Sequence, residues 1–310
     1  MRRGTSGINA LIAVDKPLGM TSHDVVARVR RSLAERRVGH AGTLDPDASG
    51  VLVVGVGQGT RLMGLLTSER KGYVGLVVFG SETETDDAEG KVTRTAEVPD
   101  WAWDEHAVRE RLAAIEGPCM QVPPAYSAIS VNGVRSYARA RAGETVELDA
   151  RPVTVHSASL AAIQDVDGYP GWLCAFEVSK GCYIRAIARD LGRACGSAAH
   201  LAGLRRTSSG SISLSSCVTL EELEREGAGV LASSALDPAA CLGAPIRSLS
   251  EADLADASCG KHLSLGSVSV EEGGRVCLVA GDKLYGVWTR RGDELVSSTN
   301  FPAGISGVRR

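Results

Sequence analysis

The chain has 310 residues, of which 44% are hydrophobic and 23% are charged, a composition typical of globular proteins. This length favours one large domain with a small appendage. No apolar run approaches the roughly 18 residues that span a membrane, and the first residues lack the apolar stretch of a secretory signal. Membrane and secreted proteins are therefore excluded, and we expect a cytoplasmic protein.

The net charge of −3 conceals a segregation of charge along the chain. Residues 1–50 carry eight Lys or Arg against five Asp or Glu, and residues 151–210 carry seven against four. Residues 81–110 carry only three against ten. Two interpretations are open: a basic face that binds RNA while the acidic segment faces away, or an acidic loop that is merely solvated and has no partner.

The eight cysteines contain no C-x-x-C pair, so the sequence indicates neither a zinc knuckle nor a disulfide framework. We expect most of them to be buried, reduced thiols. The six histidines show no spacing typical of metal ligands. No metal site is predicted.

The first third of the chain alternates apolar runs with breakers. Thr21 and Ser22 supply an N-cap for a helix whose apolar residues, from Val25 to Leu33, follow helical spacing. Residues 39–50 are polar and punctuated by glycine, which predicts a loop. The other expected elements are strands at residues 9–14, 51–56 and 73–79, a short helix at 60–66 and an acidic turn at 83–90.

The rest of the chain predicts an α+β protein with mostly antiparallel strands. Proline and glycine at 117–118 and 123–124 are expected to break regular structure. The expected elements are helices at 104–115 and 184–194, strands at 152–163 and 171–178 around a turn at 167–171, Ala-rich helical pieces after Val218, and short strands from Ile246 with turns at 273–274, 281–282 and 291–293. We therefore predict an α+β core over residues 1–245 and a small β-rich domain over 246–310.

The segment 39–50 is the most informative for function. Its Asp45 stands between an apolar residue and a proline, framed by glycines that let a backbone approach a ligand closely. In isolation, an aspartate in such a pattern more often merely caps the next segment. The Asp45-x-Asp47 pattern also resembles the nucleophile loop of haloacid-dehalogenase-type phosphatases, but that loop follows directly on a buried hydrophobic strand, whereas residues 39–42 are not apolar.

Together with its neighbours, the Asp45 segment strongly resembles the TruB family, the bacterial tRNA pseudouridine-55 synthases that act on a uridine of the tRNA T-loop. The resemblance runs in family order over about residues 8–225. It rests on seven segments, at residues 15–22, 39–46, 71–73, 83–90, 123–128, 179–185 and 204–206. It implies a pseudouridine synthase fold, whose core has a central antiparallel, mixed sheet flanked by helices. It also implies an isomerase that flips its target base out of the RNA and needs no redox change and no cofactor.

The resemblance implies three catalytic residues. Asp45 would serve as nucleophile or charge stabiliser, and the resemblance does not say at which chemical step. Tyr73 would stack on the flipped uridine, with a hydroxyl that can take part in proton transfer at C5. Arg185 would pair with Asp45 and keep that carboxylate ionised.

Five further residues are implied to bind the substrate. Tyr183 would line the pocket, and Leu204 would pack beside the base, although a core role for Leu204 is an alternative. His40 would fill the space that the flipped base leaves in the T-loop. Lys16 would either support the catalytic loop or meet a phosphate, and Gly42 belongs to the same glycine-framed loop.

Two positions depart from the family pattern or vary within it. Cys182 stands where threonine is commoner. We expect a buried thiol to be tolerated there, and sensitivity of the site to thiol reagents is the open alternative. Asp47 adds a negative charge beside Asp45, and we expect it to face outward.

Residues 246–310 occupy the place of the family's PUA-type RNA-binding domain, with eight Lys or Arg and eight Asp or Glu. They would contact the acceptor stem or merely stabilise the core. The expected partner is tRNA, bound at its T-arm and elbow, by a monomer without an obligate protein partner. Two rivals are the guide-RNA-dependent archaeal and eukaryotic relative and a tRNA-folding chaperone.

Overall fold

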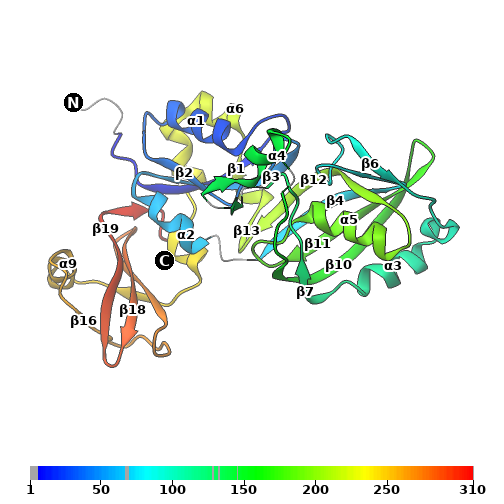
Figure 1. Cartoon of the computed structure of the whole chain (residues 1–310). Helices are drawn as coiled ribbons and strands as arrows, with labels where there is room; N and C mark the ends of the chain where they lie inside the picture. The colour runs from blue at the N-terminus through cyan, green and yellow to red at the C-terminus, as the bar shows by residue number, and fades with distance from the viewer. Residues whose placement is uncertain (1–5, 67–69, 128, 132, 145, 310) are drawn as a thin grey trace. The chain divides into compact units, whose positions relative to one another are not determined.

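The computed structural model describes residues 6–66, 70–127, 129–131, 133–144 and 146–309 (Figure 1). The chain divides into two compact units. The first comprises Met1–Ser68 and Ser208–Arg310, and the second comprises Glu69–Thr207. This division differs from the predicted boundary at residue 245, which stays a prediction.

Strands of the first unit pair around β1. β1 (Ala10–Lys16) lies antiparallel to β3 (Ala48–Val56) and parallel to β14 (Cys217–Val218), so the sheet is mixed, as predicted. A short strand, β2 (Val38–Ala41), pairs with β3. The remaining elements before the C-terminal domain are α1 (Ser22–Ser32), η1 (Gly57–Leu62), α2 (Met63–Leu66), β13 (Ile212–Ser213), η3 (Leu214–Ser216), α6 (Leu220–Glu226), η4 (Gly227–Val230), α7 (Leu231–Ser234) and α8 (Pro238–Leu242).

Strand β3 is buried along its whole length because both faces of the sheet are covered. Successive side chains of a strand point to opposite faces. Leu52 and Val54 accordingly pack with apolar residues of α1 and α6, and Val51 and Val53 pack in a second cluster on the other face. A continuous apolar run, rather than an alternating one, is typical of such a strand.

One expectation for the first unit is wrong, and another is confirmed with an earlier start. Residues 39–50 are not a continuous loop, because β2 and the start of β3 leave only residues 42–47 outside the strands. The helix expected at 60–66 begins as the tighter η1, where a Cβ on Gly59 would lie 2.2 Å from the Ala10 carbonyl oxygen. The glycine thus allows a close approach of two backbones.

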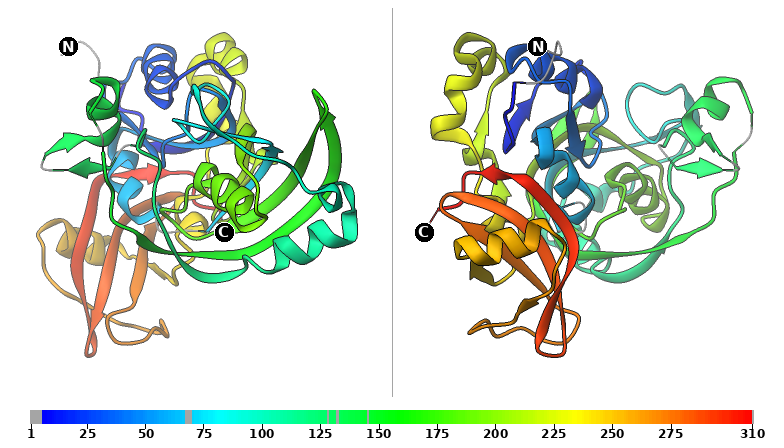
Figure 2. Two further views of the ribbon diagram at one scale, coloured as in Figure 1. Left: turned by 45° about the vertical axis from the view of Figure 1, so that its right-hand side comes forward. Right: turned by 90° about the vertical axis from the view of Figure 1, so that its left-hand side faces the viewer.

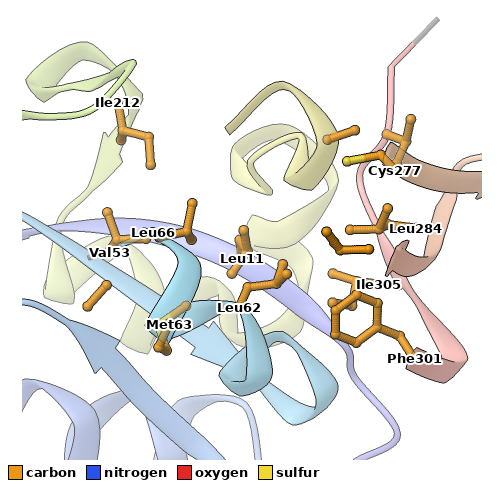
Figure 3. Close-up of a cluster of buried hydrophobic side chains, with 14 of the residues drawn as sticks. Leu11, Val53, Leu62, Met63, Leu66, Ile212, Cys277, Leu284, Phe301 and Ile305 are labelled. Atoms are coloured by element: carbon orange, nitrogen blue, oxygen red, sulfur yellow. The ribbon is translucent and has the colours of Figure 1, made fainter. Parts of the chain in front are cut away.

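The C-terminal segment forms a five-stranded sheet in the order β15-β17-β18-β19-β16. Val276 and Trp288 pack on one face in a core of their own, whereas Cys277 and Phe301 join the second cluster of β1 and β3 (Figure 3). The sequence missed α9, which caps its first turn through Ser250. The elements are β15 (Ile246–Ser248), α9 (Glu251–Ser258), β16 (Leu263–Ser264), β17 (Arg275–Ala280), β18 (Lys283–Arg291) and β19 (Glu294–Ser306).

The second unit is built on the strand order β12-β4-β11-β10-β7. Its long β10–β11 hairpin is a curved ribbon (Figure 2) with two register shifts, which are the irregularities that bend a strand. The hairpin turn is only Asp167 and Gly168, both at positive φ, and so is shorter than predicted. The strands are β4 (Lys71–Phe79), β7 (Gly117–Gln121), β10 (Arg151–Val166), β11 (Tyr169–Val178) and β12 (Ala199–Ser209).

Helices flank this sheet: α5 packs on β4, and α3 packs on β10. Helix α5 (Ile184–Ala194) has the predicted bounds, and α3 (Glu105–Ala113) begins after the N-cap Asp104. The sequence missed β12 and also β7, an edge strand that tolerates Pro118. Smaller elements are β5 (Ser81–Thr83), β6 (Val92–Thr95), η2 (Asp100–Trp103), β8 (Ser130–Val131), β9 (Val134–Arg135) and α4 (Ser136–Arg141).

The predicted fold class, an α+β core with a mixed sheet and a small C-terminal β domain, is confirmed. Within the described part of the chain, no helix combines the length and the apolar character needed to cross a membrane. All eight cysteines are free thiols, of which three are buried, three are half-buried and two, Cys119 and Cys259, are exposed. The half-buried Cys182 and Cys241 keep their thiols buried, since burial raises the pKa of both to about 12, so most of the thiols are buried as expected.

Candidate active site

The loop that carries Asp45 is fastened to the start of α1. The buried Ser22 hydroxyl donates to the Leu44 carbonyl at 3.1 Å and accepts from the Leu44 amide at 2.9 Å. The amide of Ala48 donates to the Asp45 carbonyl at 3.1 Å, which closes the turn. Asp45 is half-buried between these two anchors, so its backbone position is fixed on both sides.

Lys16 holds the other side of the same loop. Its side chain is fully buried, at 0% exposure, and its Nζ donates to the carbonyls of Pro17 at 2.8 Å and Pro46 at 3.1 Å. The Gly19 amide donates to the same Pro46 carbonyl at 3.0 Å. This geometry favours loop support over phosphate contact for Lys16, because a buried ammonium that bonds to the loop is not presented to an RNA backbone.

His40 and Gly42 lie at the entry to the loop. His40 is on β2 opposite Val54, and its ring meets the exposed His23 edge-on, with centroids 5.5 Å apart. Gly42 has φ +80°, a left-handed conformation that other residues adopt only with strain. Asp47 is exposed, which agrees with its expected outward direction.

In the second unit, Arg185 lies in the first turn of α5 and is 5% exposed. Its Nη1 donates to the Thr85 carbonyl at 2.9 Å and lies 3.3 Å from Oδ2 of Asp87. Its Nη2 donates to the Tyr126 carbonyl at 3.0 Å. These contacts hold the guanidinium group in one orientation.

Arg185 is the first of three arginines that repeat every four residues on one face of α5. Each pairs with an acidic residue of segment 82–87, and we call this set the arginine ladder. Its rungs are Arg185–Asp87 at 3.3 Å, Arg189–Asp86 at 2.7 Å, and Arg193–Glu82 at 2.6 Å. The acidic segment runs antiparallel to the helix, so its later residues meet the earlier turn.

The buried carboxylates of the ladder have shifted pKa values. Burial acts to raise the pKa of Glu82, but hydrogen bonds from Arg193 and Arg94 outweigh it, so this pKa lies below its ordinary value. Burial raises the pKa of Asp86 from its ordinary 3.8 to about 6, although Arg189 and Arg185 act in the opposite direction. Asp86 is therefore ionised at pH 7 but becomes largely protonated below pH 6.

The ladder bears on one of the two interpretations of the charge pattern, and the basic RNA-binding face stays a prediction. The idea of a merely solvated acidic loop is wrong for Glu82, Asp86 and Asp87, because each has an arginine partner. The same pairs neutralise three of the seven basic residues counted in 151–210. The charge left for RNA in that stretch is smaller than the sequence indicates.

The remaining predicted residues of the second unit surround the start of α5 or lie on strands β4 and β12. Tyr73 is on β4 opposite Phe176 and is buried, and Leu204 is half-buried on β12. Tyr183 is the N-cap of α5, where the amide of the buried Gln121 side chain bonds to both its N–H, at 2.9 Å, and its carbonyl, at 3.2 Å.

The thiol of the neighbouring Cys182 is buried, as expected, and this burial argues against the alternative of a reactive thiol. Burial raises the pKa of its thiol to about 12, so almost none of it is thiolate at neutral pH. The thiolate is the nucleophilic form of cysteine. Cys182 should therefore react slowly with thiol reagents.

The predicted residues fall into two groups. Lys16, His40, Gly42 and Asp45 belong to the first unit, and Tyr73, Tyr183, Arg185 and Leu204 belong to the second. The Asp45–Arg185 pair therefore stays a prediction.

Sequence reasoning missed the contacts of Ser22 and Gln121 and the Asp86–Arg189 ion pair. The one pattern in the sequence that indicated the ladder was the spacing of four residues between the arginines of 185–193. Ser22 was predicted only as part of an N-cap.

Comparison with known proteins decides the family. Residues 30–184 match TruB family pseudouridylate synthase, N-terminal domain, and residues 185–238 match tRNA pseudouridylate synthase B, C-terminal domain. The chain is 46% identical over 263 residues to tRNA pseudouridine synthase B of Paenarthrobacter aurescens (strain TC1), covering 84% of this chain and 82% of that protein. The chain belongs to the TruB family. It is a tRNA pseudouridine synthase, an isomerase, and the phosphatase alternative is wrong.

A second TruB family relative extends the match through the C-terminal domain. The tRNA pseudouridine synthase B of Mycobacteroides abscessus is 41% identical over 294 residues, which cover 93% of this chain and 94% of that protein. A chain in the solved structure of an H/ACA RNP bound to a substrate RNA containing 2′-deoxyuridine has a TM-score of 0.70 and 21% identity, over 96% of this chain and 86% of that one. At that identity the likeness concerns the fold alone.

Proposed function

We propose that this TruB family chain isomerises the uridine at position 55 in the T-loop of tRNA. The N1–C1′ bond breaks, the base turns, and a C5–C1′ bond forms. The C5 proton passes to solvent and N1 takes up a proton, so the atoms balance. No electrons are gained or lost overall. Asp45 supplies the carboxylate for this rearrangement, acting as nucleophile or charge stabiliser.

The observation that carries the proposal is the fixed loop around Asp45. Hydrogen bonds from Ser22 and Lys16 hold the backbone on both sides of a half-buried carboxylate. Catalysis requires reacting groups to be held in place before the substrate arrives. The same loop lies inside the matched N-terminal family domain.

The second unit supplies the other proposed contacts to the base. Tyr73 stacks on the flipped uridine, Tyr183 lines its pocket, and Leu204 packs beside it. A stacked base returns about 1–3 kcal/mol toward the cost of flipping. Arg185 is the cation that keeps the Asp45 carboxylate ionised.

His40 occupies the place that the base leaves in the RNA, and Gly42 lets the loop backbone come close to it. The C-terminal β domain shares a buried cluster with β1 and β3, which supports a stabilising role, and its contact with the acceptor stem stays a prediction. The enzyme works as a monomer in the cytoplasm, on tRNA alone, without a cofactor or an obligate protein partner.

The test is to map pseudouridine in an unmodified tRNA transcript, with EDTA present and no guide RNA. Primer extension after carbodiimide treatment should give one new stop, at uridine 55. A transcript with cytidine at that position is the control and should give none. Pseudouridine at another position only, or a requirement for a guide RNA, would contradict the proposal.

A further inference from the structure

The middle rung of the arginine ladder is the most buried of the three. Asp86 and Arg189 are 7% and 9% exposed, and Nη1 of Arg189 lies 2.7 Å from Oδ2 of Asp86. The remaining donors of Arg189 bond to the Val122 carbonyl at 2.9 Å and to Asp190 at 2.9 Å. These bonds fix the position of the Asp86–Arg189 pair. A change in the pair would therefore displace the residues next to it.

The neighbours of Asp86 in sequence are the residues that hold Arg185. The Thr85 carbonyl accepts from Arg185, and the Asp87 carboxylate lies 3.3 Å from it. Asp86 itself has φ +61°, a left-handed conformation in which the backbone turns sharply. That turn lets adjacent carboxylates, Asp86 and Asp87, reach successive turns of α5.

The segment of residues 85–88 is also hydrogen-bonded to β12. The Leu201 amide donates to the Asp86 carbonyl at 3.1 Å, and the Ala88 amide donates to the Leu201 carbonyl at 3.1 Å. Leu204 follows on that strand. A shift of Asp86 would therefore move the groups that orient Arg185 and the strand that carries Leu204.

We infer that Asp86 and Arg189 are positioning residues for the isomerisation: their buried ion pair holds Thr85 and Asp87 where they orient Arg185. This inference rests on the proposed function, in which Arg185 serves the catalytic carboxylate. The pair acts through Arg185 and does not touch the substrate. Its loss should lower kcat and leave the tRNA KM nearly unchanged.

Protonation of Asp86 supplies a readout that a merely structural pair lacks. The charged groups that face Asp86 are Arg189, Arg185, Arg193 and Asp190. Because burial raises the pKa of Asp86 to about 6, its contribution to folding stability is complete below the unfolded value of 3.8 and is lost as the pH rises through 6. Acidification should thus neutralise the Asp86 carboxylate, which the positioning role requires in its charged form. The contribution of Asp86 to folding stability should increase at the same time.

The test compares wild type, Asp86→Asn and Glu84→Gln by tritium release from C5-labelled tRNA at pH 7.5 and 5.5, with melting temperatures. Asparagine keeps the size of aspartate and tolerates positive φ, and Glu84 is an exposed acid in the same segment. We expect Asp86→Asn to lose about tenfold in kcat at pH 7.5, as a misplaced catalytic group does. It should melt no lower than wild type and give nearly equal rates at both pH values, whereas Glu84→Gln should behave as wild type.

Two results would overturn the inference. One is an unchanged kcat and pH profile for Asp86→Asn. The other is a loss of activity that only follows a loss of thermal stability.

If Asp86→Asn does not fold, the pH dependence of the wild-type enzyme tests the inference. The wild-type kcat should fall between pH 7.5 and pH 5.5 without a fall in melting temperature. An equal kcat at both pH values would contradict the inference. Arg189→Lys, which retains a charge, should restore part of the rate that Arg189→Met loses. Failure of the proposed function is distinct, because it would show as full activity of Asp45→Asn.

Discussion

The two groups of site residues are held in place by different chemistry. Around Asp45, the contacts described above join side chains of Ser22 and Lys16 to backbone amides and carbonyls. Along α5, the contacts of the ladder join arginines to carboxylates. The Asp45 loop therefore depends on hydrogen bonds to backbone groups, and the ladder depends on ion pairs. The two should respond differently to mutation and to acid.

The largest effect on the loop should come from Lys16→Met. The change removes the donor to the Pro17 and Pro46 carbonyls but keeps a side chain of similar length. We expect kcat to fall about 100-fold, because a small misplacement of a catalytic group has a cost of that size. Single-turnover rates measure this, with the exposed Lys91→Met as control. Equal rates for both variants would show that the loop does not need its buried lysine.

Ser22→Ala should have a smaller effect of the same kind. Leu44 would lose both bonds to the hydroxyl in a buried place, which destabilises the protein by about 1–3 kcal/mol. Chemical denaturation measures this loss, and the rate should fall by about tenfold at most. The pH dependence of the rate should be unchanged in this variant, because Ser22 bonds to backbone groups that do not titrate. A shifted pH dependence would contradict the contrast between the loop and the arginine ladder.

Glu82→Gln tests whether the arginine ladder depends on charge, and the measured quantity is the stability of the protein. The pKa of Glu82 is lowered, so the stabilisation from its pairs with Arg193 and Arg94 is present above pH 4.5 and is lost as the pH falls through its folded value. At pH 7 we expect a loss of about 1–3 kcal/mol in unfolding free energy. The difference in unfolding free energy between Glu82→Gln and wild type should become smaller as the pH falls. A difference that does not change with pH would contradict this.

The smallest effect is expected for Cys182→Thr, which restores the residue that is commoner in the family. Because the Cys182 thiol is buried and its pKa is raised to about 12, the exchange should leave the rate within about twofold. Wild type should also resist brief treatment with iodoacetamide at pH 7.5. Rapid inactivation that the variant escapes would show a reactive thiol.

Strong periodicity allowed much of the fold to be predicted. Helix α5 has the expected bounds because its apolar and charged residues alternate at helical spacing. Strand β12 was missed because small and polar residues fill its sequence, and its neighbours in the sheet, rather than its own pattern, make it a strand. Segment 39–50 was misread because glycines in β2 and β3 look like loop residues.

The site was predictable only where a motif marked it. The motifs named Asp45, Tyr73 and Arg185, whereas the supporting contacts join residues far apart in sequence. Ser22 lies 22 positions from Leu44, and Arg189 lies 103 positions from Asp86. No local pattern encodes such pairs, so the structure was needed to find them.

The central claim is that Asp45 drives isomerisation of a tRNA uridine. The most direct measurement is tritium release from C5-labelled uridine in an unmodified tRNA transcript, with EDTA present, by wild type and Asp45→Asn. We predict release by wild type and none by the variant, with tRNA binding retained by both. Release by Asp45→Asn at the wild-type rate, or binding without release by wild type, would contradict the account.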